Sequence, residues 1–369
     1  MRRRLLAWYR HHRRDLPWRT DPTPYAVWVS EIMLQQTTVT AAVPFYERWM
    51  KRFPTLRDLA AADEEDVLRL WAGLGYYNRA RNLHRAAMQI VSEGDGEIPH
   101  TVTDLMDLPG IGRYTAGAIA SIAFGERVPV VDANVARVLA RFFAVREEVS
   151  TADGQRILWD HAEDLTQTNN PGDLNQALME LGALVCTPTS PRCDICPIQP
   201  LCRAAQRGDM HRYPVLRERP EAVEVTEVGA AVERKGRFLI LRRPKSGRMA
   251  GMWEFPHGPL RGGEPAETVA PMVKSLTGLD IHIDEPLRTI EYTFTHHQIT
   301  LHVWRARATG GRVHRRSHDA HRWVALRDLM SRPMATAQRR IVEALMESAG
   351  GRQLDLLELG EESEESAPI

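Results

Sequence analysis

The sequence lacks the features that mark a membrane protein or a secreted protein. No apolar run in its 369 residues approaches the about 20 residues that a membrane-spanning helix needs. The basic segment 10–14 interrupts the apolar stretch near the N-terminus, so we expect no secretory signal peptide. We therefore expect a cytoplasmic protein without a membrane partner.

Net charge is also absent, because 48 Lys+Arg residues balance 48 Asp+Glu residues. Positive and negative residues are near balance within residues 1–212 as well. Any nucleic-acid surface must therefore be a local patch. The apolar content of 43% and charged content of 26% are typical of a soluble globular protein, and the length predicts two domains.

Cysteine is scarce, and all four cysteines lie within residues 186–202. This clustering favours metal ligation in a reducing compartment over a disulfide framework. The spacing is Cys-x6-Cys-x2-Cys-x5-Cys, formed by Cys186, Cys193, Cys196 and Cys202. Zinc sites usually pair two Cys-x2-Cys units, and only one is present, so the ligand set favours a [4Fe–4S] cluster, with zinc as the alternative.

Helical periodicity dominates residues 1–212, a linker rich in proline and glutamate follows at 213–227, and strand patterns begin at 228. The second domain is predicted to span 228–349, and the acidic tail 350–369 is predicted to be disordered. The expected helices are 3–11, 24–36, 45–50, 56–62, 66–71, 79–91, 113–123, 133–143, 152–165, 173–186, 267–277 and 336–348. The expected strands are 228–232, 238–241, 289–294 and 299–306, and 16–19 is expected to be a loop.

The segment 108–114 organises the first half of the chain. Gly110 and Gly112 allow a tight turn that exposes backbone N–H groups at the start of the helix 113–123, which creates an anion site. The pattern resembles the hairpin of a helix-hairpin-helix motif, which grips a DNA phosphate without recognising sequence. An ordinary corner between two helices is the alternative.

Two carboxylates stand out beside this hairpin. Glu31 lies on a largely apolar face of its predicted helix, which indicates a half-buried side chain at a groove, although a glutamate can also reach solvent from such a face. Asp132 precedes the helix 133–143 and is predicted to cap it. A helix N-terminus also keeps an aspartate ionised, so capping is compatible with a chemical role.

With these motifs in place, residues 2–345 resemble the adenine DNA glycosylases, the MutY family of helix-hairpin-helix glycosylases. The resemblance rests on the segments 16–19, 29–37 and 73–77, the hairpin, Val131-Asp132, the cysteine run and 253–256. It implies an all-helical catalytic domain with a [4Fe–4S] cluster, followed by a Nudix-like α/β domain. It also implies duplex DNA as partner.

The activity that the resemblance implies is removal of adenine mispaired with 8-oxoguanine or guanine in base excision repair. Adenine is a poor leaving group as an anion, so an acid must protonate it as the glycosidic bond breaks. Glu31 matches that acid, Asp132 matches the carboxylate that stabilises the oxocarbenium ion, and Tyr114 matches a hydrogen-bonding residue of the site.

The resemblance also implies contacts with DNA, because the target base must leave the stack. Gln36 and Tyr76 match wedge positions, and the cluster loop brings Arg192 to phosphates. Residues at matching positions of the adenine pocket are Leu16, Trp18, Arg19, Leu34 and Gln176. In the second domain, Phe294, Thr295 and His296 match a lesion-recognition loop, although two histidines in a strand turn can simply face solvent.

Several positions differ from related families, and two rival functions were considered. Relatives of the endonuclease III type have a lysine nucleophile where Tyr114 stands, so we expect a monofunctional glycosylase. An endonuclease III-like lyase on oxidised pyrimidines and a non-enzymatic iron–sulfur DNA-binding protein are the rival interpretations. Ala133 replaces a usual glycine, and the segment 269–276 lacks the carboxylates of a Nudix hydrolase, so we expect no hydrolase activity.

The tail contains three leucines in an otherwise acidic segment. The stretch resembles a motif by which bacterial proteins bind the replication sliding clamp, with a leucine in place of the final aromatic residue. The matching positions are Gln353, Leu354, Leu356 and Leu357. A C-terminal helix that packs its leucines on the second domain is the alternative. We expect a monomer.

Overall fold

The computed structural model describes residues 1–361 except 218–220, 246, 248 and 315–316, and for 350–361 it describes the backbone alone. The chain divides into two units. The first comprises Met1–Leu70 with Arg79–Arg219, and the second comprises Trp71–Asn78 with Pro220–Ile369. None of the described helices combines the length and the apolar character needed to cross a bilayer.

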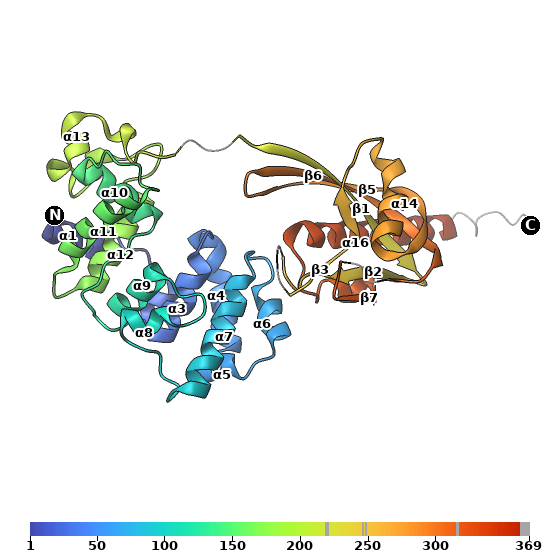
Figure 1. The fold of residues 1–369 in the computed structure, drawn as a ribbon, viewed down its shortest axis with the longest axis horizontal. Coiled ribbons are helices and arrows are strands. Elements are labelled where there is room, and N and C mark those ends of the chain that lie inside the picture. Colours follow the sequence, from blue (N-terminus) through green and yellow to red (C-terminus); the bar gives the residue numbers. More distant parts are fainter. Residues whose placement is uncertain (218–220, 246, 248, 315–316, 362–369) are drawn as a thin grey trace, which may run out of the picture. The chain divides into compact units, whose positions relative to one another are not determined.

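The first unit is helical (Figure 1). One group of helices, α1 and α10 to α13, packs around a shared core, and the remaining helices form the other group. Their bounds are α1 Arg2–His12, α2 Pro17–Thr20, α3 Pro24–Leu34, α4 Val39–Arg52, α5 Leu56–Ala60, α6 Glu64–Trp71, α7 Asn78–Glu93, α8 Val102–Met106, α9 Arg113–Ala123, α10 Ala133–Phe143, α11 Ala152–Thr166, α12 Pro171–Leu184 and α13 Arg203–Arg207.

Helix α3 runs through the interior of this unit. Thr23 caps it by accepting a hydrogen bond from the Ala26 N–H, and Pro24 occupies the first turn, where its missing N–H costs nothing. Every residue from Tyr25 to Met33 is buried. A polar side chain in the middle of this helix is therefore held inside the protein.

The second unit is built on a seven-stranded sheet of order β3-β2-β1-β6-β5, in which β4 also pairs with β1 and β7 with β2. Strands β1 and β6 are parallel, and the other pairs are antiparallel. The bounds are β1 Val223–Arg234, β2 Arg237–Arg242, β3 Trp253–Glu254, β4 His257–Pro259, α14 Pro265–Thr277, β5 Leu279–Phe294, β6 His297–Gly311, β7 Ala320–Ala325, α15 Leu326–Leu329 and α16 Thr336–Glu361.

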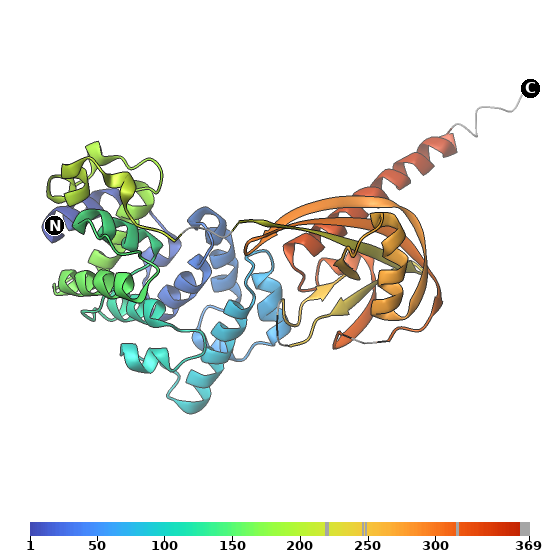
Figure 2. The ribbon, with the colours of Figure 1, turned by 45° about the horizontal axis from the view of Figure 1, so that its top comes forward.

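Alternation along β1 supplies a core on each face of this sheet. Ala231 joins a core that includes Ile341 of α16, whereas Ala230 joins a core that includes Val269 of α14. The sheet therefore lies between α14 and α16 (Figure 2). A helical domain with a helix-hairpin-helix followed by a Nudix-like α/β domain was predicted, and this fold class is confirmed.

Two elements of the first unit differ from prediction. The predicted loop 16–19 is partly helical, because Pro17 starts the short helix α2. Helix α3 ends at Leu34 rather than at 36, because Gln36 adopts a left-handed backbone with φ of 56° that cannot continue a right-handed helix.

The second unit begins and ends differently from prediction. Strand β1 starts at Val223, inside the predicted linker, because Val223 pairs with His297 of β6. The backbone of α16 stays helical to Glu361, where a disordered tail was predicted from 350. The clamp-like residues 353–357 lie on this backbone, and their side chains lie outside the described residues.

The segment Trp71–Asn78 belongs to the second unit, which the sequence did not indicate. The Tyr77 hydroxyl donates a hydrogen bond to the Met334 carbonyl at 2.9 Å. Gly75 and Tyr76 both have left-handed backbones, with φ of 72° and 47°, so the chain turns sharply and leaves Tyr76 58% exposed. Tyr76 is thus presented at a turn tip.

Candidate active site

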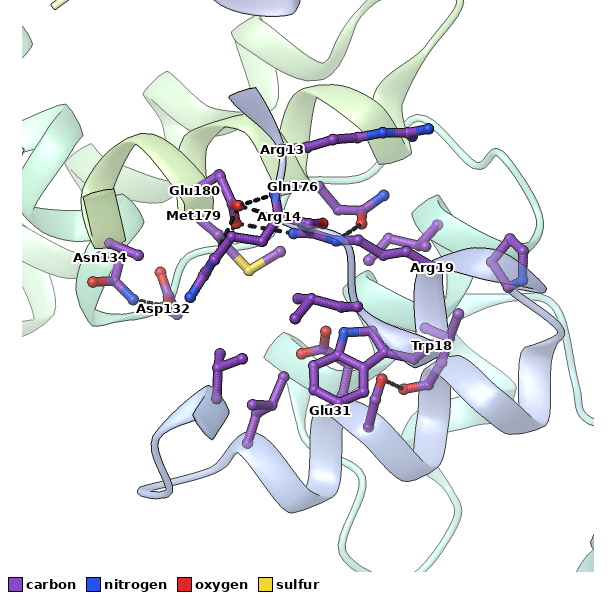
Figure 3. Close-up of a pocket in the computed structure, with 18 of the residues that line it drawn as sticks. Arg13, Arg14, Trp18, Arg19, Glu31, Asp132, Asn134, Gln176, Met179 and Glu180 are labelled. Carbon is purple, nitrogen blue, oxygen red and sulfur yellow. Dashed lines mark hydrogen bonds and ion pairs between the residues drawn. The ribbon is translucent and has the colours of Figure 1, made fainter. Parts of the chain in front are cut away.

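A cavity of about 430 Å³ lies in the first unit, where residues of both helix groups meet (Figure 3). Its walls come from the α1–α2 connection, α3, the first turn of α9, the N-terminus of α10 and α12. Predicted site residues that line it together are Leu16, Trp18, Arg19, Leu34, Glu31, Tyr114, Asp132 and Gln176. Sequence positions more than a hundred residues apart therefore converge on one space.

Glu31 enters the cavity from the buried helix α3 and is only 6% exposed, which is deeper than the half-buried side chain expected. Burial raises the pKa of Glu31 to about 7, the hydrogen bond from Tyr114 opposes that rise, and the negative charge of Asp132 adds to it. Near neutral pH, a substantial fraction of Glu31 is therefore an uncharged acid.

Tyr114 stands in the first turn of α9 and donates its hydroxyl proton to Glu31 Oε2 at 2.6 Å. Burial raises the pKa of Tyr114 well above its ordinary value, and the neighbouring carboxylates of Glu31 and Asp132 act in the same direction. The phenol therefore remains a proton donor at any physiological pH and orients the Glu31 carboxyl group.

Asp132 caps α10, as predicted. Its Oδ1 accepts a hydrogen bond from the Val135 N–H at 2.7 Å, and its Oδ2 accepts one from Asn134 Nδ2 at 2.9 Å. The carboxyl group of Asp132 is therefore held in place at the N-terminus of α10. Ala133 is the first residue of α10 and is exposed, so its methyl group fits at this position, where the resembled family usually has glycine.

Glu180 of α12 is a site residue that the sequence analysis missed. Its carboxylate accepts hydrogen bonds from Arg14 at 2.9 Å and from Arg19 at 3.0 Å, and its side chain is 1% exposed. Burial alone would raise the pKa of Glu180, but these two guanidinium groups lower it to about 2. Arg14 and Arg19 were visible in the sequence, but nothing near them indicated a partner, because Glu180 lies more than 150 residues further along the chain.

Through this ion pair, Glu180 fixes one wall of the cavity. The Arg19 guanidinium is held by Glu180 and by the Arg14 carbonyl at 2.9 Å, and its Nε donates to Gln176 Oε1 at 3.2 Å. Trp18 packs edge-on against Tyr46 with ring centroids 5.2 Å apart. The cavity thus has a fixed polar edge and a fixed apolar wall.

The hairpin between α8 and α9 lies outside the cavity. Gly110 has a φ of 79°, and a Cβ at this position would lie 2.5 Å from the Cβ of Asn82 on α7, so only glycine fits. Gly112 is the exposed N-cap of α9, and Leu108 and Ile111 are buried beneath the turn. Backbone N–H groups at this helix start are available to an anion.

The four cysteines line one small cavity of about 30 Å³, as a shared metal site requires. Burial raises the pKa of the Cys196 thiol to about 11, so thiolates there need the positive charge of a metal centre. Arg141, 3% exposed, supplies further positive charge and donates to Cys186 Sγ at 3.3 Å and to the Thr187 carbonyl at 2.7 Å. The donor set therefore fits a thiolate-ligated iron–sulfur cluster.

A chain of hydrogen bonds connects this loop with Asp132. Asn134 donates to Asp132, Arg137 Nη2 donates to Asn134 Oδ1 at 2.8 Å, and Arg137 Nε donates to the Cys186 carbonyl at 2.8 Å. Arg137 also donates to the Gly182 carbonyl. The position of Asp132 thus depends on the cluster loop.

The remaining predicted contacts lie elsewhere. Arg192 is exposed, but its guanidinium donates to the Leu184 carbonyl at 2.5 Å. Gln36 is exposed just beyond α3, and Tyr76 belongs to the second unit. Thr295 and His296 form a two-residue exposed turn between β5 and β6 that follows Phe294, shorter than the predicted loop because β6 begins at His297.

A second buried polar cluster lies in the second unit. Glu254 accepts hydrogen bonds from Arg243 and His318, both at 2.9 Å, and pairs with His257 at 3.3 Å. Burial alone would lower the pKa of His257, but hydrogen bonds to Glu227 and Glu254 raise it to about 9. Each carboxylate of this cluster faces a cation, so the cluster is suited to holding strands together.

Comparisons with known proteins show which families this chain matches. Residues 29–163 match the model of the HhH-GPD superfamily of base excision DNA repair proteins, 186–202 match the iron–sulfur binding domain of endonuclease III, and 227–344 match a NUDIX domain. The adenine DNA glycosylase of Rattus norvegicus is 36% identical, over 95% of this chain and 78% of the relative. That of Homo sapiens is 37% identical, over 91% and 72%.

The chain belongs to the adenine DNA glycosylase family. A bacterial member from Buchnera aphidicola subsp. Schizaphis graminum is 34% identical over 81% of this chain and 84% of its own length. Among solved structures, a thermostable thymine-DNA glycosylase has a TM-score of 0.52 and 29% identity, and covers 56% of this chain and 94% of its own. As an adenine DNA glycosylase family member, the protein carries a [4Fe–4S] cluster.

The raised pKa of Glu31 predicts a specific dependence of stability on pH. Between about 4.5 and 7 the folded state keeps a proton that the unfolded state releases, so stability falls as pH rises through this window. In Glu31→Gln the free energy of unfolding should no longer fall over this pH window. At pH 8 the variant should therefore be more stable than wild type, by roughly 3 kcal/mol at most. Urea unfolding of wild type and Glu31→Gln at pH 5 and pH 8 measures this difference. An identical pH dependence of the free energy of unfolding in the two proteins would contradict the assigned pKa.

The depressed pKa of Glu180 predicts the opposite. Its contribution to stability is present above about 4.5 and is lost as pH falls toward 2. Glu180→Gln leaves two guanidinium groups without their counter-charge and should lower the free energy of unfolding at pH 7 by about 3 kcal/mol. Asp153→Asn removes an exposed partner of Arg156 and is the matched control, with a change within about 0.5 kcal/mol. Equal losses in the two variants would rule out a role for burial.

Proposed function

We propose that this protein removes adenine from duplex DNA in which adenine is paired with 8-oxoguanine or guanine, by hydrolysing the N-glycosidic bond. The observation that carries the proposal is the pair of carboxyl groups in one cavity, with Glu31 buried at a pKa of about 7 and Asp132 anchored at a helix N-terminus. A neutral acid and a fixed anion are the two groups that departure of a purine from a sugar requires.

In this proposal, Glu31 supplies the proton. Adenine that has left the stack enters the cavity, and the Glu31 carboxyl group donates to a nitrogen of its five-membered ring. As the bond between the sugar and the base breaks, its electron pair goes to the base, which leaves as neutral adenine. Tyr114 holds the carboxyl group through the 2.6 Å hydrogen bond.

Asp132 acts on the sugar in the same proposal. Bond cleavage leaves positive charge on C1′ and the ring oxygen, and a fixed carboxylate stabilises that charge without reorganising. Addition of water at C1′, with loss of a proton, leaves an abasic site. The hydrogen bonds from Val135 and Asn134 keep the carboxylate in place for this step.

The lining of the cavity favours a monofunctional glycosylase over a lyase. A lyase of the endonuclease III type needs an amine nucleophile, and Tyr114 occupies the matching position. None of the side chains that line this cavity belongs to a lysine. A purely DNA-binding protein would have no use for a buried acid beside an anchored carboxylate, so the non-enzymatic alternative is also disfavoured.

The adenine pocket is proposed to use the two fixed walls of the cavity. Leu16 and Trp18 provide apolar surface for the faces of the base. Arg19 and Gln176 provide the polar edge, because Glu180 orients Arg19 and Arg19 in turn donates a hydrogen bond to Gln176. Leu34 completes the pocket from α3.

DNA binding is proposed to use separate surfaces. The hairpin at Gly110 and Gly112 presents backbone N–H groups to a phosphate, and Gln36 and Tyr76 are the proposed wedges. The cluster held by Cys186, Cys193, Cys196 and Cys202 would shape the loop with Arg192, which would exchange its Leu184 carbonyl for a phosphate. These contacts position the duplex and carry no sequence information.

The base opposite adenine is proposed to be recognised by Phe294, Thr295 and His296. Thr295 and His296 are exposed, and Thr295 has a left-handed backbone with φ of 55°, as a tight turn between two strands requires. Helix α14 carries a single carboxylate, Glu267, so the domain lacks the acidic helix of a Nudix hydrolase. A cytoplasmic monomer that binds the sliding clamp through 353–357 remains a prediction.

The chemistry is tested by Glu31→Gln and Asp132→Asn. Each variant should lose adenine release almost completely, because each removes a separate requirement for bond cleavage, while binding to the mismatch survives. In wild type the single-turnover rate should fall as pH rises through about 7, where Glu31 loses its proton. A rate within about tenfold of wild type for either variant would refute the assigned roles.

Lesion recognition is tested by replacing Thr295 and His296 together with alanine. The preference for 8-oxoguanine over guanine opposite adenine should weaken by about 1–3 kcal/mol, the scale of one base contact. Single-turnover rates on both mispairs measure the preference. Gln298→Ala serves as the control, because Gln298 is exposed and lies just beyond the turn. An unchanged preference in the double variant would place recognition elsewhere.

A further inference from the structure

The C-terminal end of α3 is completed by an arginine from another helix. A helix leaves its last four carbonyl groups without intrahelical partners, and here the helix is buried almost to its end. Arg79, in the first turn of α7, donates from Nη1 to the carbonyls of Ile32 at 2.8 Å, Met33 at 3.1 Å and Gln35 at 2.5 Å. Its Nη2 lies 3.4 Å from Thr37 Oγ1. One guanidinium group therefore spans the helix end and the turn that follows.

That turn, formed by Gln35, Gln36 and Thr37, has an unfavourable backbone. Gln36 is not a glycine but has a φ of 56°, so surrounding contacts must hold it. A second contact comes from α9, where Thr115 Oγ1 accepts a hydrogen bond from Gln35 Nε2 at 3.3 Å. Gln36 itself is exposed. The turn is thus fixed from two sides while its central side chain is presented to solvent.

Helix α7 also supports the hairpin. Asn82, one turn after Arg79, packs so closely against Gly110 that no side chain fits there. The first turns of α7 therefore set the position of the phosphate-binding turn and of the turn at Gln36 relative to each other. A duplex held at the hairpin would meet Gln36 in a defined place.

We propose that Arg79 is a positioning residue that keeps the turn Gln35–Thr37 preformed, assisted by Gln35, so that Gln36 enters the base stack as adenine leaves it. This inference rests on the proposed glycosylase function. A preformed wedge loses little conformational entropy on insertion, which favours the extruded state. Arginine places two nitrogens on this segment, Nη1 at the three carbonyls and Nη2 at Thr37, whereas a lysine offers one compact and more strongly hydrated ammonium group.

Arg79 does not line the cavity that contains Glu31, so its effect should fall on extrusion and spare the protonation of Glu31. Extrusion can be measured with 2-aminopurine, a fluorescent adenine analogue, placed opposite 8-oxoguanine. Arg79→Lys should lower both the extruded fraction and the single-turnover rate on adenine by about tenfold. The pH at which the rate is half-maximal should stay at the wild-type value.

Two comparisons sharpen the test. Arg81→Lys, two residues away and paired with Glu64 at 3.1 Å, is the matched control and should behave as wild type. Adding Arg79→Lys to Gln36→Ala should change extrusion by less than about twofold, because both changes act on one step. Gln35→Ala should lower extrusion in the same direction, and it carries the test if Arg79→Lys melts below the assay temperature.

The proposal is overturned by unchanged extrusion in Arg79→Lys, or in Gln35→Ala where that variant carries the test. It is also overturned if Arg79→Lys and Gln36→Ala act independently, or if the pH profile shifts. The fluorescence signal does not require hydrolysis. Failure of wild type to release adenine would therefore reject the proposed function, while the extrusion data would still report on Arg79.

Discussion

The structure of the first unit depends on placing a carboxyl group inside an apolar helix. Because α3 is buried from Tyr25 to Met33, Glu31 is only 6% exposed where it reaches the cavity, and its carboxyl group accepts a hydrogen bond from the Tyr114 hydroxyl. Burying an ionised carboxylate is costly, so the group keeps its proton to a higher pH instead. The unpaired carbonyls at the end of the same helix then need a donor, which Arg79 provides.

Two glutamates in one cavity show how surroundings decide between acid and anchor. Glu31 meets a neutral phenol and has a raised pKa, whereas Glu180 meets two guanidinium groups and has a lowered one. Both are almost fully buried, so burial alone cannot explain the difference. The hydrogen-bond partner explains the difference. Beside the neutral phenol, Glu31 can keep its proton near pH 7, whereas Glu180 stays ionised beside two guanidinium groups and orients Arg19.

The sequence predicted the elements whose signals are local. Caps, glycines and helical periodicity located α9 and α10 and the N-cap role of Asp132, because these depend on residues within one turn. Glu180 and Arg79 could not be found this way, because their partners lie far away in sequence and only the fold brings them together. The start of β1 was missed for the same reason, because the first residues of this strand pair with β6, which lies about 70 residues later in the sequence.

Helix α10 relates the cluster to the chemistry. Asp132 caps its N-terminus, Arg137 lies just over one turn later, and Arg141 follows one turn after that, with both arginines directed to the cysteine loop. The guanidinium groups satisfy backbone carbonyls of a loop that has little regular structure of its own. A metal centre that fixes this loop therefore also fixes α10, and with it the carboxylate of Asp132. Glu31 stands on α3, outside this connection, so the cluster loop bears on the position of Asp132 more directly than on that of Glu31.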